Sequence, residues 1–482
     1  MLRLGGIALL ALGASVSAHP DPARNRLGTA IDRIVERPAL AHAFWGIEVR
    51  SLDSGRTLYE RHADKGFRPA STLKLVTTAA ALDAFGPEAR LRTTVETTAR
   101  LDGQGRILGD VFLVGRGDPG LSGRFDGGSP TAAFETMADA LVEAGVRRIE
   151  GRLVGHEGAF GGDRRGADWM LEDLAWGYGA EVSALTFNDN VVHVTLSPGE
   201  RPGDPAVLEA VPRTSFVTVM SAVVTGAAET DEDIVLDRPL GSNRVHLSGV
   251  LPRGGEWDEE VAVEDPALYA VTVFGEVLQA KGIAVMRGVA TSSDPLPADT
   301  RVLAVHEGVS VARRIEEVNK ESQNLHAELL LRLLGQRVLG EGTTEKGLEA
   351  VEEFLSRLGV PHAGWGLKDG SGLSHTNVLT PRGLAALLVA MDRHPQAEAF
   401  RASLAVAGAS GKLKERMGGT AAEARVMAKS GGMQRVNALA GYVTTESGEP
   451  LVFAILVNNQ VELSTSAKAA IDEIVFALAT VR

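Results

Sequence analysis

The spacing of apolar positions divides the chain into segments of different kinds. Phe44 to Leu52 is largely apolar and leads into the turn residues Asp53-Ser54-Gly55, which predicts a hairpin to a second strand at 57–60. Apolar residues then recur with helical spacing from Ser71 to Leu82, and Gly86-Pro87 ends the pattern. This part of the chain is therefore predicted to form two strands and a helix.

The last third of the chain combines two apolar, strand-like segments with several stretches of helical spacing. The apolar segments 436–443 and 450–457 are separated by Glu446-Ser447-Gly448, which predicts two neighbouring strands joined by a turn. The helices predicted in this region are 311–318, 325–334, 347–358, one that begins at Pro381, and an amphipathic helix at 466–481.

The middle of the chain has a different pattern. Between residues 91 and 299, short β-like runs such as 192–196 and 215–219 are separated by Gly, Pro, Asp and Asn. We therefore predict an α/β (α+β) fold in which one domain, 19–90 and 305–482, is split by an inserted β-rich region at 91–304. The insertion is expected to hold one domain or a nested pair.

The first residues have the layout of a secretory signal peptide at 1–18. Arg3 precedes an apolar stretch from Gly5 to Gly13, and Val16-Ser17-Ala18 supplies the small residues of a cleavage site. A buried N-terminal helix is the alternative. No cysteine is available for a lipid anchor, and no later apolar run is long enough to span a bilayer. We therefore expect an exported protein of the periplasm or cell wall, without a transmembrane anchor.

Composition excludes several kinds of chemistry. The 482 residues contain no cysteine, so disulfides, cysteine nucleophiles, iron–sulfur clusters and thiolate zinc sites are ruled out. The formal net charge of −13 makes the chain a poor candidate for nucleic-acid binding. Only 10 of the 49 basic residues are lysine, so each lysine position is informative.

Ser71-Thr72-Leu73-Lys74 is the first candidate for chemistry. Residues three apart share a helix face, so the Ser71 hydroxyl and the Lys74 amine can meet. A serine needs a base to become a nucleophile, and a buried lysine with a lowered pKa can be that base, whereas arginine cannot. It is the only Ser-x-x-Lys in the chain. The alternative is a capping serine beside a solvated lysine.

Two further motifs follow in the C-terminal part. Ser322-Gln323-Asn324 precedes a predicted helix and offers a second hydroxyl and an amide, although such a triplet is also an ordinary helix N-cap. Lys429-Ser430-Gly431-Gly432 is expected just before the strand pair, where Lys429 and Ser430 could bind a carboxylate and Gly431 could admit an extended peptide. The Gly432 and Ser71 N–H groups could form an oxyanion hole. A glycine-rich hairpin turn with an exposed lysine is the alternative.

The order Ser-x-x-Lys, Ser-x-Asn, Lys-Ser-Gly is the combination of β-lactamases and penicillin-binding proteins. The chain resembles the penicillin-recognising serine acyl-enzymes, and more narrowly the class C low-molecular-weight penicillin-binding proteins, the D-alanyl-D-alanine carboxypeptidase/endopeptidase (peptidase S13) family. The long insertion between the first two motifs is itself a feature of that family. The segments that carry the resemblance are 69–74, 178–190, 322–328, 369–374, 403–408 and the Lys429 segment.

The resemblance implies a role for each motif residue. Ser71 would attack the penultimate D-Ala carbonyl of peptidoglycan peptides that end in D-Ala-D-Ala, and Lys74 would be the base. Ser322 would relay the proton to the leaving D-alanine, assisted by Asn324 and Lys429. Lys429 and Ser430 would hold the terminal carboxylate, and β-lactams would act as inhibitors. Ser430 stands where threonine is common in the family.

Other readings of the chemistry are weaker. No metal-binding His-Glu-x-x-His, P-loop or dinucleotide motif is present, so neither a metal nor a cofactor is expected. His326 stands where an aromatic residue is frequent in the family and is interpreted as a packing or surface residue. A β-lactamase or esterase of the same fold, and a non-catalytic wall-binding scaffold, are the alternative functions. Oligomeric state is left open.

Overall fold

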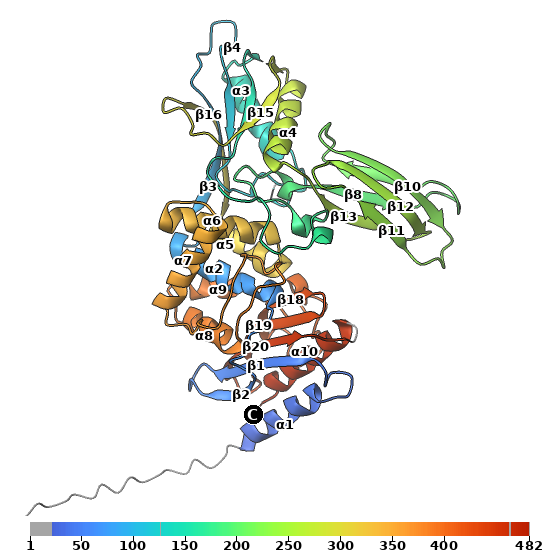
Figure 1. Cartoon of the computed structure of the whole chain (residues 1–482), viewed down its shortest axis with the longest axis vertical. Coiled ribbons are helices and arrows are strands. Elements are labelled where there is room, and N and C mark those ends of the chain that lie inside the picture. Colours follow the sequence, from blue (N-terminus) through green and yellow to red (C-terminus); the bar gives the residue numbers. More distant parts are fainter. Residues whose placement is uncertain (1–21, 126, 462–463, 482) are drawn as a thin grey trace, which may run out of the picture.

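The computed structural model describes residues 22–125, 127–461 and 464–481 of the chain (Figure 1). The predicted signal peptide at 1–18 lies outside the described residues. Within them, an antiparallel sheet with helices on both faces forms one end of the molecule, and a large insertion between helices α2 and α5 forms the other.

The sheet joins strands from the two ends of the chain. Its order is β17-β18-β19-β20-β1-β2, and each neighbouring pair is antiparallel. Ile47 of β1 lies opposite Ile455 of β20, so the predicted N-terminal hairpin extends the predicted C-terminal strand pair. The strands are β1 (Phe44–Ser51), β2 (Thr57–Arg61), β17 (Ala405–Val406), β18 (Val426–Met433), β19 (Val436–Thr444) and β20 (Pro450–Asn458).

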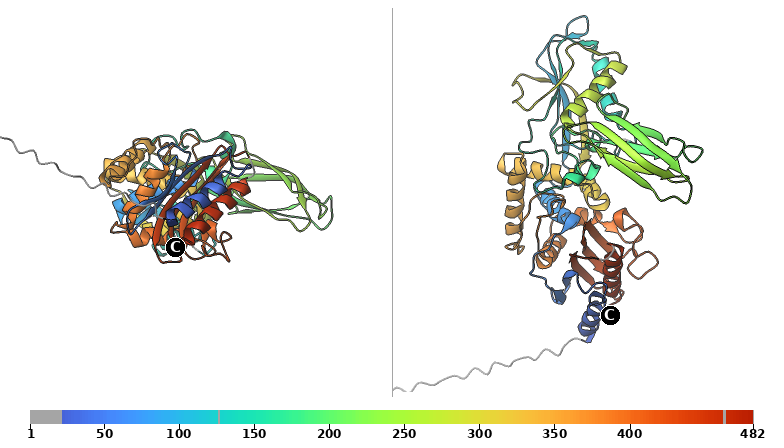
Figure 2. Two further views of the ribbon diagram at one scale, coloured as in Figure 1. Left: turned by 90° about the horizontal axis from the view of Figure 1, so that it is seen from below. Right: turned by 45° about the vertical axis from the view of Figure 1, so that its right-hand side comes forward.

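Each face of this sheet has its own apolar core. Alternate strand residues such as Ile455 pack with α1 and α10, which lie side by side (Figure 2). Residues of the opposite parity such as Leu456 pack against the helical layer that contains α2, α6 and α8. The helices are α1 (Pro22–Val35), α2 (Lys74–Phe85), α5 (Val311–Glu316), α6 (Asn324–Leu339), α7 (Thr344–Arg357), α8 (Pro381–Asp392), α9 (Ala397–Ala402) and α10 (Ser464–Ala479).

The insertion leaves and re-enters the helical layer at one place. The N–H groups of Val311 and Ala312 donate to the carbonyls of Ala89 and Pro87, each at 2.9 Å, so the outgoing and returning chains lie together. A five-stranded sheet, β15-β7-β5-β3-β16, follows and packs against α3 and α4. Its elements are β3 (Arg90–Thr97), β5 (Val111–Val114), α3 (Ala132–Glu143), β7 (Leu153–His156), α4 (Pro266–Ala280), β15 (Val289–Ser292) and β16 (Arg301–Ser310). A small sheet beside it contains β4 (Arg106–Ile107), β6 (Arg148–Ile149) and β14 (Ala284–Val285).

Two three-stranded sheets project from the side of the insertion (Figures 1 and 2). Their apolar faces meet in a shared core that includes Leu196 and Leu247. They are β13-β8-β9 and β10-β12-β11, made of β8 (Val191–Ser197), β9 (Val207–Val211), β10 (Thr218–Gly226), β11 (Asp233–Asp237), β12 (Arg244–Pro252) and β13 (Trp257–Ala262).

The elements agree with most of the expectations and correct some of them. The strand predicted at 192–196 is confirmed as β8, whereas only the last two residues of the predicted strand 215–219 belong to β10. Helices α1, α3, α4 and α9 were not expected. The boundary predicted between 304 and 305 falls inside β16, and the division into domains stays a prediction.

Candidate active site

Ser71 lies in a 3-10 turn, Ala70–Leu73, directly before α2. Ala70 has a φ of +46°, an uncommon conformation for a residue with a side chain. Lys74 is the first residue of α2, and its Nζ donates to Ser71 Oγ at 3.0 Å. The expected meeting of the two side chains is confirmed.

Lys74 is fully buried among neutral hydrogen-bond partners. Besides Ser71, its Nζ donates to Asn324 Oδ1 at 2.6 Å and to the Ser371 carbonyl at 2.7 Å. Burial lowers the pKa of Lys74 to about 7, although the negative charges of Asp369 and Glu328 oppose the change. A substantial fraction of Lys74 is therefore neutral near pH 7, as a general base requires.

Asn324 contacts Lys74 from the start of α6, and Ser322 lies two residues before it. Ser322 follows a π-helical turn, Glu317–Glu321, and has a φ of +70°. The helix N-cap is Gln323 rather than Ser322, because the Gln323 side chain accepts from Leu325 N–H. Asn324 accepts from Lys74 and donates through Nδ2 to the Tyr178 carbonyl at 2.8 Å. The triplet thus contributes side chains to the site instead of serving only as a cap.

Lys429 lies within strand β18, which directly precedes the predicted strand pair, now β19 and β20, and pairs with β19. Its Nζ is buried and donates to Ser322 Oγ at 2.9 Å and to the Ser430 carbonyl at 2.8 Å. Burial first, and then the positive charges of Lys74 and Lys412, lower the pKa of Lys429 well below its usual value. Through Ser322, the second and third motifs are in direct contact.

The two glycines after Ser430 have different surroundings. A Cβ at Gly431 would lie 2.8 Å from the Pro69 carbonyl and 3.2 Å from Ser71 N, so this glycine makes room for the turn of Ser71. A Cβ at Gly432 would meet nothing within 4 Å. The open position along β18 is therefore Gly432, and the role of Gly431 in peptide binding stays a prediction. Ser430 is partly exposed beside them.

Glu328 lies in one of the segments that carry the family resemblance, but the sequence alone assigns it no role. It is buried on α6, and its carboxylate accepts the N–H groups of Gly370 (3.0 Å) and Ser371 (2.7 Å). Because the Ser371 carbonyl is a partner of Lys74, Glu328 holds the loop that orients the lysine. Burial and the charge of Asp369 raise the pKa of Glu328 to about 7. The segment 369–374, singled out by resemblance, was the available signal.

Asp369 fixes the other part of this loop. It accepts N–H bonds from Gly372 (2.9 Å) and Ser374 (2.6 Å), and the indole of Trp169 donates to it at 3.0 Å. Gly372 has a φ of +84°, and a Cβ there would lie 2.0 Å from the Ala70 carbonyl. Trp169 belongs to the insertion, so the insertion contacts the 369–374 loop, whose Ser371 carbonyl accepts from Lys74.

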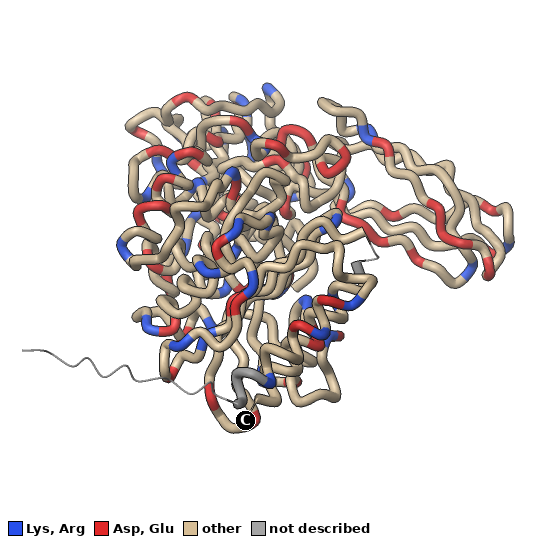
Figure 3. The backbone as a smooth tube through the Cα atoms, turned by 60° about the horizontal axis from the view of Figure 1, so that its bottom comes forward, with Lys and Arg blue, Asp and Glu red and all other residues tan. Residues whose placement is uncertain are grey.

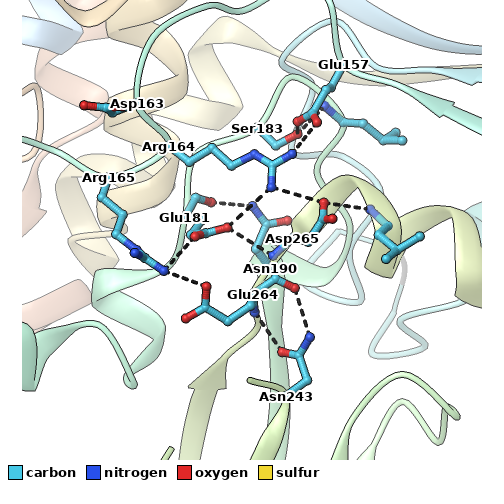
Figure 4. A network of polar contacts seen from close by, with 12 residues as sticks. Glu157, Asp163, Arg164, Arg165, Glu181, Ser183, Asn190, Asn243, Glu264 and Asp265 are labelled. Carbon is cyan, nitrogen blue, oxygen red and sulfur yellow. Dashed lines mark hydrogen bonds and ion pairs between the residues drawn. The ribbon is translucent and has the colours of Figure 1, made fainter. Parts of the chain in front are cut away.

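A network of ion pairs anchors the insertion segment that carries Trp169 and Tyr178 (Figure 4). Arg164 pairs with Glu157, and Arg165 lies 2.9 Å from Glu181 and 2.6 Å from Glu264. Figure 4 shows these side chains converging from separate parts of the insertion. The insertion segment that carries Trp169 and Tyr178 is thus fixed by several partly buried charges rather than by one contact.

His326 packs within the fold. It is fully buried on α6, stacks on the Phe125 ring, and its Nε2 lies 2.8 Å from Asp189 Oδ1. Burial would raise the pKa of Asp189, but His326 and Arg124 outweigh burial and lower it to about 2. The expectation of a packing residue is confirmed, and the surface alternative is wrong.

The three motifs open onto one cleft of about 580 Å³. Ser71, Ser322, Asn324 and Gly432 line it, together with Lys412, which sequence reasoning did not single out. Among the residues that the structure describes, no group of three or more His, Asp or Glu side chains is arranged to hold a metal ion. The cleft presents two serine side chains, and a buried lysine is hydrogen-bonded to each of them: Lys74 to Ser71 and Lys429 to Ser322. This set of groups is suited to acyl transfer.

Comparison with known proteins decides the family. Residues 27–481 match the family described as D-Ala-D-Ala carboxypeptidase 3 (S13). The chain belongs to this family. A D-alanyl-D-alanine carboxypeptidase from Actinomadura sp. (strain R39) is 38% identical over 463 residues, covering 93% of this chain and 84% of that protein. The predicted S13 peptidase is confirmed: the chain is a serine-type D-alanyl-D-alanine carboxypeptidase/endopeptidase.

Solved structures confirm the fold of this S13 enzyme. Penicillin binding protein 4 (dacB) from Haemophilus influenzae superposes with a TM-score of 0.81 at 21% identity, covering 93% of this chain and 98% of that one. The same protein complexed with a β-lactam matches with a TM-score of 0.75, at 20% identity and the same coverage. In the described part of the S13 chain, no helix has the length and apolar character needed to cross a membrane.

Proposed function

We propose that Ser71 is the acyl carrier and that the three motifs trim peptidoglycan peptides that end in D-Ala-D-Ala. The observation that carries this proposal is the continuous chain of contacts from Ser71 through Lys74 and Asn324, with Lys429 joined to Ser322 on the same cleft. A neutral lysine beside the nucleophile removes the usual obstacle to serine attack at neutral pH.

In the proposed reaction, Ser71 Oγ attacks the carbonyl carbon of the penultimate D-Ala while its proton passes to Lys74 Nζ. The C–N bond to the last residue breaks, and Ser322, held by Lys429, passes a proton to the leaving nitrogen. The proton that Lys74 took from Ser71 then replaces the proton that Ser322 gave up, so both groups return to their starting state. An ester to Ser71 remains. Water then attacks that ester, returns the proton to Ser71, and releases the shortened peptide.

Two N–H groups are proposed to stabilise the negative charge on the carbonyl oxygen. Ser71 and Gly432 both line the cleft, and the space beside Gly432 is open. Lys429 and Ser430 would bind the terminal carboxylate. An arriving carboxylate would favour the charged form of Lys429, whose pKa burial has lowered. β-Lactams are proposed to acylate Ser71 in the same way, and the enzyme is proposed to act outside the cytoplasm after export.

A labelled penicillin tests the assignment. Wild type should become covalently labelled, and Ser71→Ala should not, whereas Ser54→Ala, in the exposed turn between β1 and β2, should label like wild type. Release of D-alanine from a D-Ala-D-Ala peptide should follow the same pattern. A folded wild-type protein that takes up no penicillin and releases no D-alanine would contradict the proposal, and rapid turnover of a cephalosporin without D-alanine release would favour the β-lactamase alternative.

A further inference from the structure

The charged residues that line the cleft around Ser71 are mostly acidic. Glu172, Asp173 and Glu321 line it, and among the described residues Lys412 is the single lysine or arginine in the lining. Figure 3 shows further acidic residues along the segments where the projecting sheets meet the body of the molecule. A peptide that ends in a carboxylate therefore enters past negative charges, and a cation at the rim of the cleft would favour its entry.

The two buried lysines of the site are poor sources of this first attraction. Burial lowers the pKa of Lys74 to about 7, so a substantial fraction of it is neutral near that pH. Burial and the positive charges of Lys74 and Lys412 lower the pKa of Lys429 well below its usual value. Lys412 is exposed and forms no ion pair with another described residue. Its ammonium is therefore available to an anion that arrives from solvent.

The backbone on both sides of Lys412 is held firmly in the fold. Lys412 is the middle residue of the 3-10 turn Gly411–Leu413. A Cβ at Gly411, whose φ is +54°, would lie 2.6 Å from the Lys320 carbonyl, so the glycine lets this turn pack against the π-helical turn before Ser322. Leu413 is fully buried in the apolar core to which strand β18 contributes. The turn thus contacts both the segment that leads to the second motif and the strand that carries the third.

Lys412 lies on the side of the cleft from which the last residue of the substrate departs, and this step rests on the proposed function. Lys412 and Ser322 also line an adjoining hollow of about 320 Å³, whereas Ser71 lines the cleft and not this hollow. In the proposed reaction Ser322 passes a proton to the leaving nitrogen, and Lys429 binds the carboxylate of the same leaving residue. The carboxylate therefore arrives on the side where Lys412 is exposed.

We propose that Lys412 is a specificity residue that attracts the terminal carboxylate of the substrate at the rim of the cleft, before that carboxylate reaches Lys429. Once inside, the carboxylate favours the ammonium form of Lys429 and so completes its own binding site. Lys412 takes no part in proton transfer or in acyl transfer. It contributes an attraction between exposed charges, which promotes productive encounter and is weakened by salt.

The experiment compares two substrates that place the same acyl group on Ser71. One is a peptide that ends in D-Ala-D-Ala, and the other is the p-nitrophenyl ester of that peptide without its last residue. Only the first has a carboxylate on its leaving group. The measured quantity is the ratio of kcat/KM for the peptide to kcat/KM for the ester. Lys412→Gln should lower this ratio about five-fold, mainly through a higher KM for the peptide, which is the effect of one exposed charge pair.

Two further variants and a salt series test whether charge is the cause. Lys412→Arg keeps the positive charge and should keep most of the wild-type ratio. Lys414→Gln removes the same charge from an exposed lysine that lines neither hollow, and it should leave the ratio at the wild-type value. Raising the salt concentration should lower the ratio in wild type, and it should lower it less in Lys412→Gln.

The outcomes separate this role from the reaction itself. An unchanged ratio in Lys412→Gln, or an equal fall in Lys414→Gln, overturns the role of Lys412 while the proposed function stands. A higher ratio in Lys412→Gln also overturns it, because Lys412 would then act only by lowering the pKa of Lys429. Wild type that hydrolyses neither substrate and takes up no labelled penicillin contradicts the proposed function itself. Because both substrates use Ser71, a variant that is partly unfolded loses both activities equally, and its ratio does not change.

Discussion

The buried lysines of the active site and the buried arginine where the insertion meets the helical layer have different partners. In the active site, Lys74 and Lys429 are buried and hydrogen-bonded to hydroxyl, amide and carbonyl oxygens, without a carboxylate in ion-pair contact. Where the insertion meets the helical layer, Arg314 is equally buried but lies 3.3 Å from Asp118. Lysine without an anion can give up its proton, whereas arginine beside an anion keeps its charge. The active-site lysines can therefore take part in proton transfer, whereas Arg314 holds the insertion to the helical layer through an ion pair.

Exchanging the cation at the base position should have the largest effect. Lys74→Arg keeps the positive charge but cannot accept a proton from Ser71, so acylation by penicillin should slow by about 10³-fold or more. The second-order acylation rate constant measures this. Lys468→Arg, on an exposed position of α10, should acylate at the wild-type rate. Acylation of Lys74→Arg within a few fold of wild type would remove Lys74 from the role of base.

Breaking the pair at the junction should affect stability instead. Asp118→Asn leaves the buried Arg314 without its anion and should lower the free energy of unfolding by about 3 kcal/mol, measured by urea denaturation. The double variant Asp118→Asn/Arg314→Met should recover part of the loss, because no buried charge is then unpaired. If the single variant is as stable as wild type, the pair does not hold the junction.

The pH dependence tests the state of Lys74. Because its pKa is lowered to about 7, the ammonium form dominates below that pH, and acylation should slow about ten-fold for each pH unit below 7. Above pH 7 the neutral form dominates, and the rate should level off. Acylation rates between pH 5 and pH 9, with circular dichroism at each pH to confirm folding, give the profile. A rate independent of pH over this range would contradict a titrating Lys74.

Glu328 should change the position of that profile. The negative charge that Glu328 carries above its own pKa of about 7 favours the ammonium form of Lys74, so Glu328→Gln should lower the lysine pKa and move the midpoint of the profile to lower pH, by about half a unit. Arg332 and Asp369 also interact with Glu328, and both remain in the variant. Loosening of the 370–371 loop should also lower the plateau rate. A lower plateau with an unmoved midpoint would assign Glu328 a purely structural role. Glu353→Gln, on the exposed side of α7, is the control.

The sequence alone predicted the site residues that lie close to one another along the chain. Ser71 and Lys74 are three residues apart, and Ser322 and Asn324 are two apart, so motif spacing and order were sufficient to find them. Glu328 and the Ser371 carbonyl were not assigned roles, because a buried carboxylate that acts through backbone N–H groups of a distant loop leaves no local pattern. Lys412 likewise enters the cleft only through the tertiary fold.

Helix α4 was missed for a related reason. α4 is rich in Val, Phe and Tyr, and Tyr269, Val271 and Phe274 are all buried against the insertion sheet. A helix that is apolar on most sides loses the periodic contrast that identifies helices in a sequence. Its signals were the cap at Asp265, which accepts from Leu268 N–H, and the proline that follows it. The sheet order, in contrast, depends on pairing between distant strands and has no local signal.

The position of β1 between β20 and β2 determines when this protein can first function. During synthesis, Ser71 and Lys74 emerge early, and all strands of the insertion follow before β18, β19 and β20 exist. The insertion core needs only residues between β3 and β16, so it can form while the first hairpin still lacks its partner. The wall that carries Lys429 is added last. A partly synthesised chain therefore already contains the nucleophile but has no active site around it.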